Sequence, residues 1–153
     1  MRLGDLPAVA ALEAACHTPL PPEGEALFAE RLALFPEACL AHEDEAGLGG
    51  YVVAHPWGSA SPPALGQRLH TLPREADCLH LLDIALAPRA RGRGLVAAAL
   101  GHLVAAARAR GLTLLSLVAV HGTAPLWRRH GFVPSAAASS GYGGGIAMLR
   151  RLA

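Results

Sequence analysis

Apolar positions in the first third of the chain recur every three or four residues, the spacing that gathers side chains on one face of a helix. Asp5 stands where an N-cap is expected, and Pro7 falls in the first turn after it. We therefore expect one helix after Asp5 and a second over residues 23–34. Two apolar runs, residues 39–42 and 50–55, flank an acidic turn and predict a pair of strands.

The pattern changes in the second half, where strands and a helix alternate. Residues 80–86 and 114–120 are apolar runs of strand length, and between them an Ala/Leu-rich stretch has helical spacing up to Gly111. A strand, a helix and a second strand in this order predict a right-handed crossover between parallel strands. A short helix ending at Gly131, a strand from Phe132 and a closing strand within residues 142–149 complete the expected order.

Residues 56–77 are rich in Pro, Gly and Ser and show no clear period. Loops of this length are uncommon and are often lids or binding loops. Trp57 and His70 are candidate contacts to a substrate, and an ordered surface loop without such a role is equally open.

Length and composition predict one domain over residues 1–153, because 153 residues build a single substantial core. The net charge of +1 gives no bias toward nucleic acid or an anionic membrane. Three widely spaced cysteines, Cys16, Cys39 and Cys78, fit neither a disulfide framework nor a metal site, so we expect no metal and a reducing, cytoplasmic location. The N-terminus shows no apolar targeting segment, which predicts a soluble protein.

The most informative stretch is the Gly/Arg-rich turn after residues 80–86, Arg91-Gly-Arg-Gly-Leu95, which opens directly into the Ala/Leu-rich helix. Gly92 and Gly94 allow a tight turn and a close approach of the backbone to a ligand. The first amides of the helix have no intrahelical hydrogen-bond partner, and the helix dipole favours an anionic ligand there. The turn therefore predicts a site for a pyrophosphate.

Two common nucleotide motifs are excluded at this turn. No Lys follows the glycines with a Ser or Thr, as a P-loop requires. The spacing is also wrong for the dinucleotide fingerprint, since Gly92-Arg-Gly94 is followed by Leu95, Val96 and Ala97, and no acidic residue follows Asp83.

The turn instead resembles the acetyl-CoA loop of the GCN5-related N-acetyltransferases, [RQ]-x-x-G-x-[GA], with Arg91 and Gly94 matching and Val96 where Gly or Ala is usual. A shifted register from Arg89 also satisfies the pattern but places Pro88 too close to it. A second segment, residues 121–133, is similar to the family's N-x-x-A-x-x-[FLY]-Y-x-x-x-G-F sequence. The resemblance is strongest from Leu79 to Phe132.

The resemblance implies an α/β fold of the α+β type: a mixed, mostly antiparallel sheet flanked by helices, with a splayed parallel strand pair that holds the pantetheine arm. Backbone groups near Leu86 would pair with that arm and polarise the thioester carbonyl, and the amides of the turn would hold the pyrophosphate. The cofactor-binding residues implied are Ile84, Ala85, Leu86, Arg91, Gly92, Arg93, Gly94, Leu95, Val96, Ala97, His121 and Trp127. A plain strand-to-helix turn, whose glycines serve geometry only, is the alternative.

An amine with a pKa of ~10.4 must lose a proton before it attacks a thioester, so a general base is required. His80 lies where relatives carry a His or Glu on this strand, and imidazole suits the task at neutral pH. Asp83 is the second candidate, as the carboxylate inside this apolar strand. Alternation places the two on opposite faces unless a bulge intervenes. For both, a structural role is the alternative.

The family's usual general acid, a Tyr, is replaced by Trp127, whose indole N–H donates a hydrogen bond but does not deliver a proton. Tyr142 is a candidate substitute if the C-terminal segment folds over the site, although a packing role is the alternative. His121 replaces the Asn that commonly touches the cofactor arm.

We therefore expect an N-acetyltransferase that moves an acetyl group directly from acetyl-CoA to a small-molecule or peptide amine in a ternary complex, with a homodimer possible. Three alternatives stay open: a catalytically silent acyl-CoA-binding sensor, an acyltransferase with a non-acetyl donor or a hydroxyl acceptor, and an interaction module. The sequence does not identify the acceptor.

Overall fold

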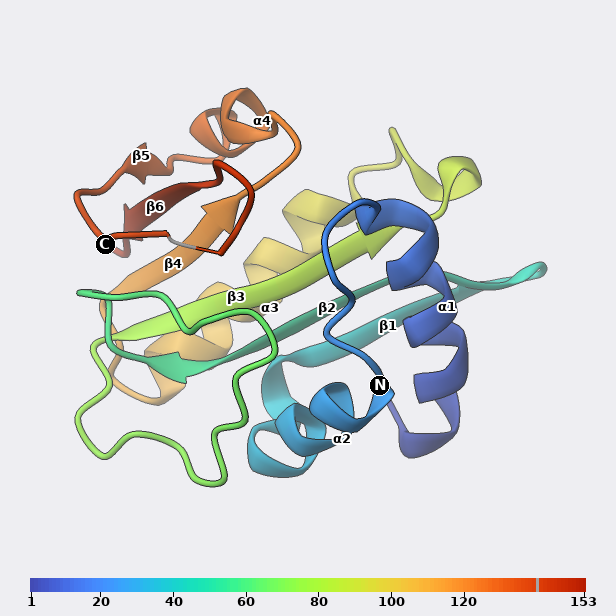
Figure 1. Ribbon diagram of the computed structural model, residues 1–153, viewed down its shortest axis with the longest axis horizontal. Coiled ribbons are helices and arrows are strands. Elements are labelled where there is room, and N and C mark those ends of the chain that lie inside the picture. The colour runs from blue at the N-terminus through green and yellow to red at the C-terminus, as the bar shows by residue number, and fades with distance from the viewer. Residues whose placement is uncertain (140) are drawn as a thin grey trace.

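A computed structural model describes residues 1–139 and 141–153, and its frame is a mixed sheet of six strands in the order β1-β2-β3-β4-β6-β5 (Figure 1). The strands are β1 (Cys39–Asp44), β2 (Gly47–Trp57), β3 (Cys78–Leu86), β4 (Leu114–Ala119), β5 (Val133–Pro134) and β6 (Ile146–Arg151). Each neighbouring pair is antiparallel except β3 and β4, which are parallel. The fold class predicted from the sequence is confirmed.

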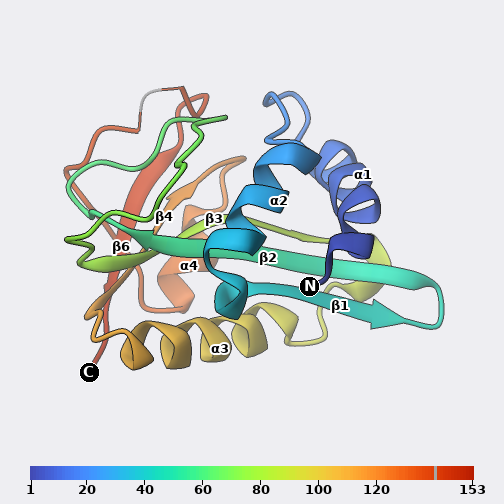
Figure 2. The same cartoon turned by 90° about the horizontal axis from the view of Figure 1, so that it is seen from below.

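Helices cover both faces of the sheet (Figure 2). Helices α1 (Leu6–His17) and α2 (Glu25–Leu34) lie on one face, and α3 (Leu95–Ala109) and α4 (Ala124–Arg129) lie on the other. Three short 3-10 turns, Leu3–Asp5, Pro36–Ala38 and Pro88–Ala90, connect these elements. No helix of the described chain is long and apolar enough to cross a membrane.

Each face of the sheet buries its own apolar cluster. Leu79, Leu81 and Leu100 belong to the cluster under α3 and α4, whereas Phe28 and Tyr51 belong to the cluster under α1 and α2. Burial of such side chains contributes roughly 1.5–3 kcal/mol each to folding. These two clusters hold β3 between them, so the position of every side chain on that strand is well defined.

A β-bulge changes the phase of β3 at its middle. Leu81 pairs with Ala54 and Asp83 pairs with Val53, so Leu82 is an extra residue without a partner on β2. Side chains before the bulge alternate normally, and those after it are rotated to the opposite face. As a result Asp83 joins His80 on the face of α1 and α2. The alternation without a bulge would have separated them.

The same part of β3 loses its second neighbour. Cys78 to Leu81 pair with Leu114 to Leu117 of β4, and beyond these residues the two parallel strands separate. Backbone groups of β3 that would pair with β4 are therefore free to face a ligand. The predicted splayed strand pair is present.

Several element boundaries differ from the sequence expectation. Helix α2 begins at Glu25 instead of residue 23, because Glu23 turns away to contact the long loop. Asp5 precedes α1, but its carboxylate accepts the Arg2 N–H at 2.6 Å and makes no capping bond to the helix. The closing strand begins at Ile146, so Tyr142 lies in the turn before it.

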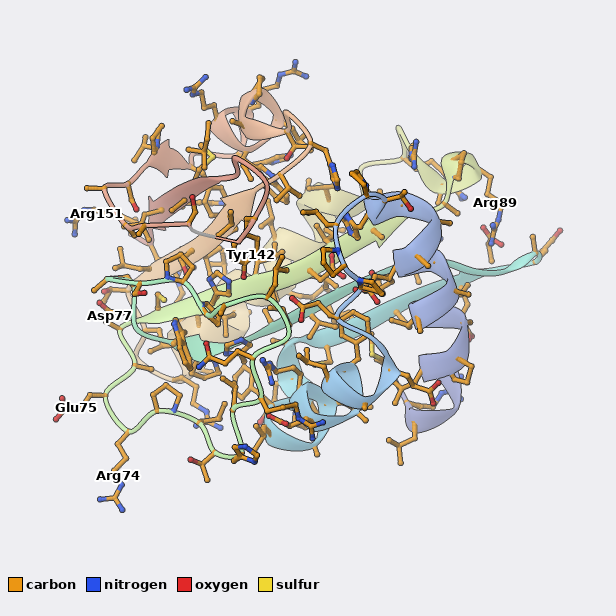
Figure 3. All side chains as sticks on the ribbon, viewed as in Figure 1. Arg74, Glu75, Asp77, Arg89, Tyr142 and Arg151 are labelled. Atoms are coloured by element: carbon orange, nitrogen blue, oxygen red, sulfur yellow. The ribbon has the colours of Figure 1, made fainter. Side chains whose placement is uncertain are left out.

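The long loop, residues 58–77, is tied to α2 by polar contacts. Glu30 accepts hydrogen bonds from the Leu69 and His70 amides and binds Arg68, and together these contacts lower the pKa of Glu30 to about 2 although burial opposes the shift. Arg31, fully buried, donates to the Gln67 carbonyl at 2.6 Å. Further along the loop, Arg74 and Glu75 point away from the molecule (Figure 3). The segment is an ordered wall on the side of the sheet that carries α1 and α2.

Candidate active site

A cavity of about 570 Å³ occupies the gap where β3 and β4 separate. It extends from the exposed Arg91–Gly92 turn to Leu81 and Leu117, the last paired residues of the two strands. Its remaining wall comes from the end of α1 and from the segment that leads into α4. A groove of this shape accepts an elongated ligand with one end at the turn and the other beside α1.

The turn at the mouth of the cavity has the conformation that its glycines predict. Gly92 and Gly94 have φ of 72° and 75°, the left-handed region that favours glycine, and Gly94 is the N-cap of α3. In the described part of the chain, none of the amides from Gly92 to Ala97 donates to a backbone carbonyl. These free donors and the helix dipole make an anion site suited to a diphosphate.

Arg89 and Arg91, on either side of the start of the turn, make different contacts. Arg89 binds Asp44 at 3.1 Å and the Leu48 carbonyl at 2.8 Å, which fixes the start of the turn to the β1–β2 hairpin and lowers the pKa of Asp44. Arg91 lines the cavity, and its Nε donates to the Leu86 carbonyl at 3.1 Å. This geometry favours the register that begins at Arg91.

The inner end of the cavity holds a pair of titratable side chains from distant parts of the chain. His17, at the end of α1, places Nε2 2.7 Å from Oδ1 of Asp83 on β3. The other carboxylate oxygen of Asp83 accepts a hydrogen bond from the Tyr51 hydroxyl at 2.8 Å. Both His17 and Asp83 line the cavity, so the pair can exchange a proton with a ligand.

Electrostatics at this pair favour a protonated imidazole. Contact with the Asp83 carboxylate raises the pKa of His17, although partial burial opposes the shift. Burial and the Asp83 charge raise the pKa of Tyr51, which therefore stays a neutral hydrogen-bond donor. A neutral histidine beside a carboxylate accepts a proton readily, because the carboxylate stabilises the imidazolium that forms, and this is the arrangement expected of a general base.

A smaller cavity of about 50 Å³ lies behind this pair, on the side of α1 and α2. It shares His17, Leu82, Asp83, Val118 and Val120 with the large cavity, and Glu13, Glu23 and Tyr142 complete its polar lining. Burial raises the pKa of Glu13 and raises that of Glu23 to about 7. Burial therefore favours the neutral form of both carboxyl groups, and the pocket that they line, called the acidic pocket below, adjoins the pair.

Tyr142 and Glu23 also hold the long loop against this pocket. The Tyr142 hydroxyl donates to the Pro63 carbonyl at 2.6 Å, and the Gly66 N–H donates to Glu23 at 2.8 Å. Tyr142 lies over the sheet near its centre (Figure 3). Its hydroxyl is thus engaged with the loop and not with the large cavity.

His80 occupies a different environment. It is 1% exposed, lines neither of these cavities, and its Nδ1 lies 2.8 Å from the Ser116 hydroxyl oxygen. Burial and the neighbouring His55 hold the pKa of His80 well below its usual range. The bulge brings His80 and Asp83 to the same face, yet it is Asp83 that reaches the cavity.

Most residues predicted to bind the cofactor are in place around the large cavity. Those that line it are Ile84, Ala85, Leu86, Arg91, Gly92, Val96, His121 and Trp127. The others, Arg93, Gly94, Leu95 and Ala97, belong to the same turn and the first turn of α3. Trp57 and His70 line neither cavity: the Trp57 indole donates to the Ser61 carbonyl, and His70 is exposed. In the described residues, no three His, Cys, Asp or Glu side chains gather as metal ligands would.

Sequence reasoning missed His17, Tyr51, Glu13 and Glu23. Each lies outside the motifs around the turn, and each reaches the site through packing of α1, α2 or β2 on the sheet. One signal was available, because Glu13 falls on the predicted buried face of α1 and is 2% exposed. A buried carboxylate on an apolar helix face needs partners, and here the Glu23 and Gly24 amides supply them.

A mixed sheet whose parallel centre opens around a groove, with an anion-binding turn at its mouth, is the fold of an acyltransferase class. The chain belongs to the acetyltransferase (GNAT) family, whose model matches residues 6–132. Among curated proteins, none matches the chain significantly.

Solved structures of the same fold cover nearly the whole chain. The ribosomal-protein-S18-alanine N-acetyltransferase from Escherichia coli is 21% identical, with a TM-score of 0.67 and coverage of 100% of this chain and 91% of that one. The GphF GNAT-like decarboxylase in complex with isobutyryl-CoA is 20% identical, with a TM-score of 0.79 and coverage of 100% and 97%. The loading GNATL domain of CurA from Lyngbya majuscula is 14% identical, with a TM-score of 0.80 and coverage of 99% and 94%. At these identities the likeness shows the fold.

Proposed function

We propose that the protein is an acetyl-CoA-dependent N-acetyltransferase that uses His17 and Asp83 as its general base. The observation that carries the proposal is the 2.7 Å contact between His17 Nε2 and Asp83 Oδ1 at the inner end of the groove. A base at this point lies between the groove for the thioester and the acidic pocket for the acceptor.

The groove supports binding of acetyl-CoA along its length. The free amides from Gly92 to Ala97 would hold the diphosphate, and the unpaired edge of β3 beyond Leu81 would pair with the pantetheine arm. Leu86 is the exception, because its carbonyl accepts hydrogen bonds from Arg91 and Cys16 in the free protein. That contact must open if the arm is to pair with Leu86.

The acidic pocket supports an amine acceptor. Asp83, together with the ionised fractions of Glu13 and Glu23, gives it a negative potential, which attracts a cationic ammonium group. The amine must then lose a proton, because only the neutral nitrogen has a free electron pair. His17 and Asp83 take up this proton as a coupled pair.

Transfer then occurs in a single complex of both substrates. The amine nitrogen attacks the thioester carbonyl carbon, a C–N bond forms, and the carbonyl electron pair moves to oxygen. The nitrogen then gives its second proton to the His17–Asp83 pair, which has passed the first one to solvent. When the carbonyl re-forms, the C–S bond breaks and its electron pair leaves with sulfur. The acetylated amine and coenzyme A are the products, and no acyl-enzyme is required.

Calorimetry with coenzyme A and a thiol-release assay test this function. We expect coenzyme A to bind with micromolar affinity, and acetyl-CoA to release thiol when a primary amine is supplied. Lack of binding would overturn the proposal. Isobutyryl-CoA and alcohols belong in the panel, because a non-acetyl donor and a hydroxyl acceptor are compatible with the same groove.

A silent acyl-CoA sensor is the second candidate, and the Trp127 environment favours it. The family's usual Tyr is absent, and the Trp127 indole donates to the Thr123 hydroxyl at 3.2 Å, away from any leaving group. Binding of coenzyme A without thiol release for any acceptor in the panel would select the sensor.

A further inference from the structure

We infer that His121 is the general acid that protonates the departing thiolate of coenzyme A. This inference rests on the proposed acetyl transfer. It assigns the proton donor that the replacement of Tyr by Trp127 leaves open.

The first argument is the inventory of the large cavity. Its lining side chains with dissociable protons are Cys16, His17, Asp83, Arg91, His121, Thr123 and Trp127. Thr123 donates to the Val120 carbonyl at 2.7 Å and Trp127 donates to Thr123, so both protons are already engaged. Arg91 does not give up its proton near neutral pH.

Of the remaining groups, His17 and Asp83 serve as the base on the acceptor side. Cys16 points its thiol to the Leu86 carbonyl, near the mouth of the groove and close to Arg91. His121 is the imidazole that remains, and imidazole serves as a general acid or base in catalysis.

The second argument is the position of His121. It follows β4 directly, and its ring stacks on His17 with centroids 5.6 Å apart and planes 15° apart. The charged and titratable groups around it are His17 and Cys16 from α1, Asp83 from β3, Arg91 from the turn, and Tyr142 from the segment before β6. His121 therefore lies beside the base pair and lines the same cavity.

The third argument is backbone strain. His121 has φ of 52° and Gly122 has φ of 70°, and the Thr123 N–H donates to the Val120 carbonyl at 3.0 Å. Positive φ at both central residues defines a type I′ turn, which favours Asn or Gly at the first of them. A His at that place costs stability, and such outliers cluster at functional sites.

The proton balance closes with His121 in this role. The ammonium form of the acceptor first loses one proton, which passes through the base pair to solvent. The base pair then takes a second proton from the nitrogen after the C–N bond forms, and the His121 imidazolium gives one proton to sulfur as the C–S bond breaks. The products are a neutral amide and a neutral thiol. Exchange with solvent then returns His17 and His121 to their starting protonation states.

The test uses His121→Asn, because Asn fits the left-handed turn and lacks an acidic proton. We expect kcat to fall about 10²-fold, at the low end for general acid catalysis because a thiolate is a fair leaving group. The alkaline decline of kcat, which reports deprotonation of the acid, should disappear. His102→Gln, an exposed imidazole on α3, is the matched control and should leave both features unchanged.

Readouts that do not depend on turnover separate this role from a binding contact. Calorimetry should give coenzyme A affinity within about threefold of wild type, and the midpoint of thermal unfolding should stay equal or rise as turn strain is relieved. A loss of coenzyme A affinity as large as the loss of kcat would make His121 a cofactor contact and overturn the inference.

Two further outcomes also overturn it. If His121→Asn keeps full kcat, the proton comes from elsewhere, and loss of the alkaline decline in Cys16→Ser would identify the thiol as its source. If the wild-type protein itself releases no thiol with any acceptor, the proposed transfer fails and the inference falls with it. Full kcat in His121→Asn is compatible with the proposed function, whereas absence of thiol release by the wild-type protein contradicts it.

Discussion

Two histidine clusters lie at opposite ends of the same face of β3, and their surroundings differ. His17 sits beside Asp83 at a cavity, and the carboxylate raises its pKa. His80 and His55 are enclosed at the other end, with ring centroids 5.8 Å apart, and burial lowers the pKa of both. A charged partner and access to a ligand make an imidazole a proton acceptor for catalysis, whereas enclosure keeps it neutral and structural.

The largest effect should follow from Asp83→Asn, which keeps the shape of the side chain and removes its charge. The base would lose the group that holds its proton, so kcat should fall by roughly 10²- to 10⁴-fold. Thiol release measures this change, and calorimetry should show unchanged coenzyme A binding. Full activity in this variant would show that catalysis does not need the Asp83 charge, and the His17 cluster would then have no catalytic role that the His80 cluster lacks.

The pH dependence of stability should have opposite signs at the two ends of β3. His55 titrates at about 4 when folded and at about 6.5 when unfolded, so the unfolded state binds more protons and stability falls as pH drops from about 6.5 to about 4. The loss approaches about 3 kcal/mol, because one pKa unit corresponds to about 1.4 kcal/mol.

The raised pKa of His17 acts in the opposite direction, since its contribution is present below about 6.5 and is lost as pH rises through the folded value. Urea unfolding from pH 4 to pH 8 measures both, with His55→Gln and His17→Gln as the matched pair. An acid slope that His55→Gln leaves unchanged would contradict the enclosed, neutral state of that ring.

A smaller effect is expected from His80→Leu. The Ser116 hydroxyl would lose its imidazole partner, and the free energy of unfolding should fall by about 1–3 kcal/mol. Denaturant titration measures the loss, while kcat of the folded fraction should stay near wild type. A 10²-fold drop in kcat with unchanged stability would instead assign the base to His80.

The smallest effect should come from Tyr51→Phe. The variant removes one hydrogen bond to Asp83 and keeps the ring within the cluster under α1 and α2. We expect a loss of about 1 kcal/mol in stability and less than about tenfold in kcat. Because Tyr51 only orients the carboxylate, the pH optimum should shift more than the rate at that optimum falls. A rate loss equal to that of Asp83→Asn would mean that Tyr51 itself transfers a proton.

The sequence predicted what depends on neighbouring residues. The strand–turn–helix around Gly92 and Gly94, the parallel pair and the overall order of elements all follow from local period and glycine placement. The pairing of His17 with Asp83 does not, because it arises only when α1 packs across the sheet. Alternation of polar and apolar residues also hides the extra residue at Leu82, since an apolar side chain suits either face.

The long loop was equally hidden from local reasoning. Its residues show no period because Glu23, Glu30 and Tyr142 hold it from outside, mainly through contacts with its backbone carbonyls and amides, with Arg68 as the exception. Backbone contacts do not require particular side chains in the loop, so the position of the loop could not be predicted from its sequence.

The bulge at Leu82 has a consequence for how this site can vary. Deleting that single residue would make Leu81 and Asp83 consecutive, and strict alternation would then keep Asp83 opposite Leu81, on the face of α1 and α2. If Leu82 were instead paired with Val53, every side chain beyond it would change face, and Asp83 would enter the apolar layer beneath α3, where an ionised group is costly. The orientation of the site therefore depends on leaving Leu82 out of the ladder, and not on the number of residues in the strand.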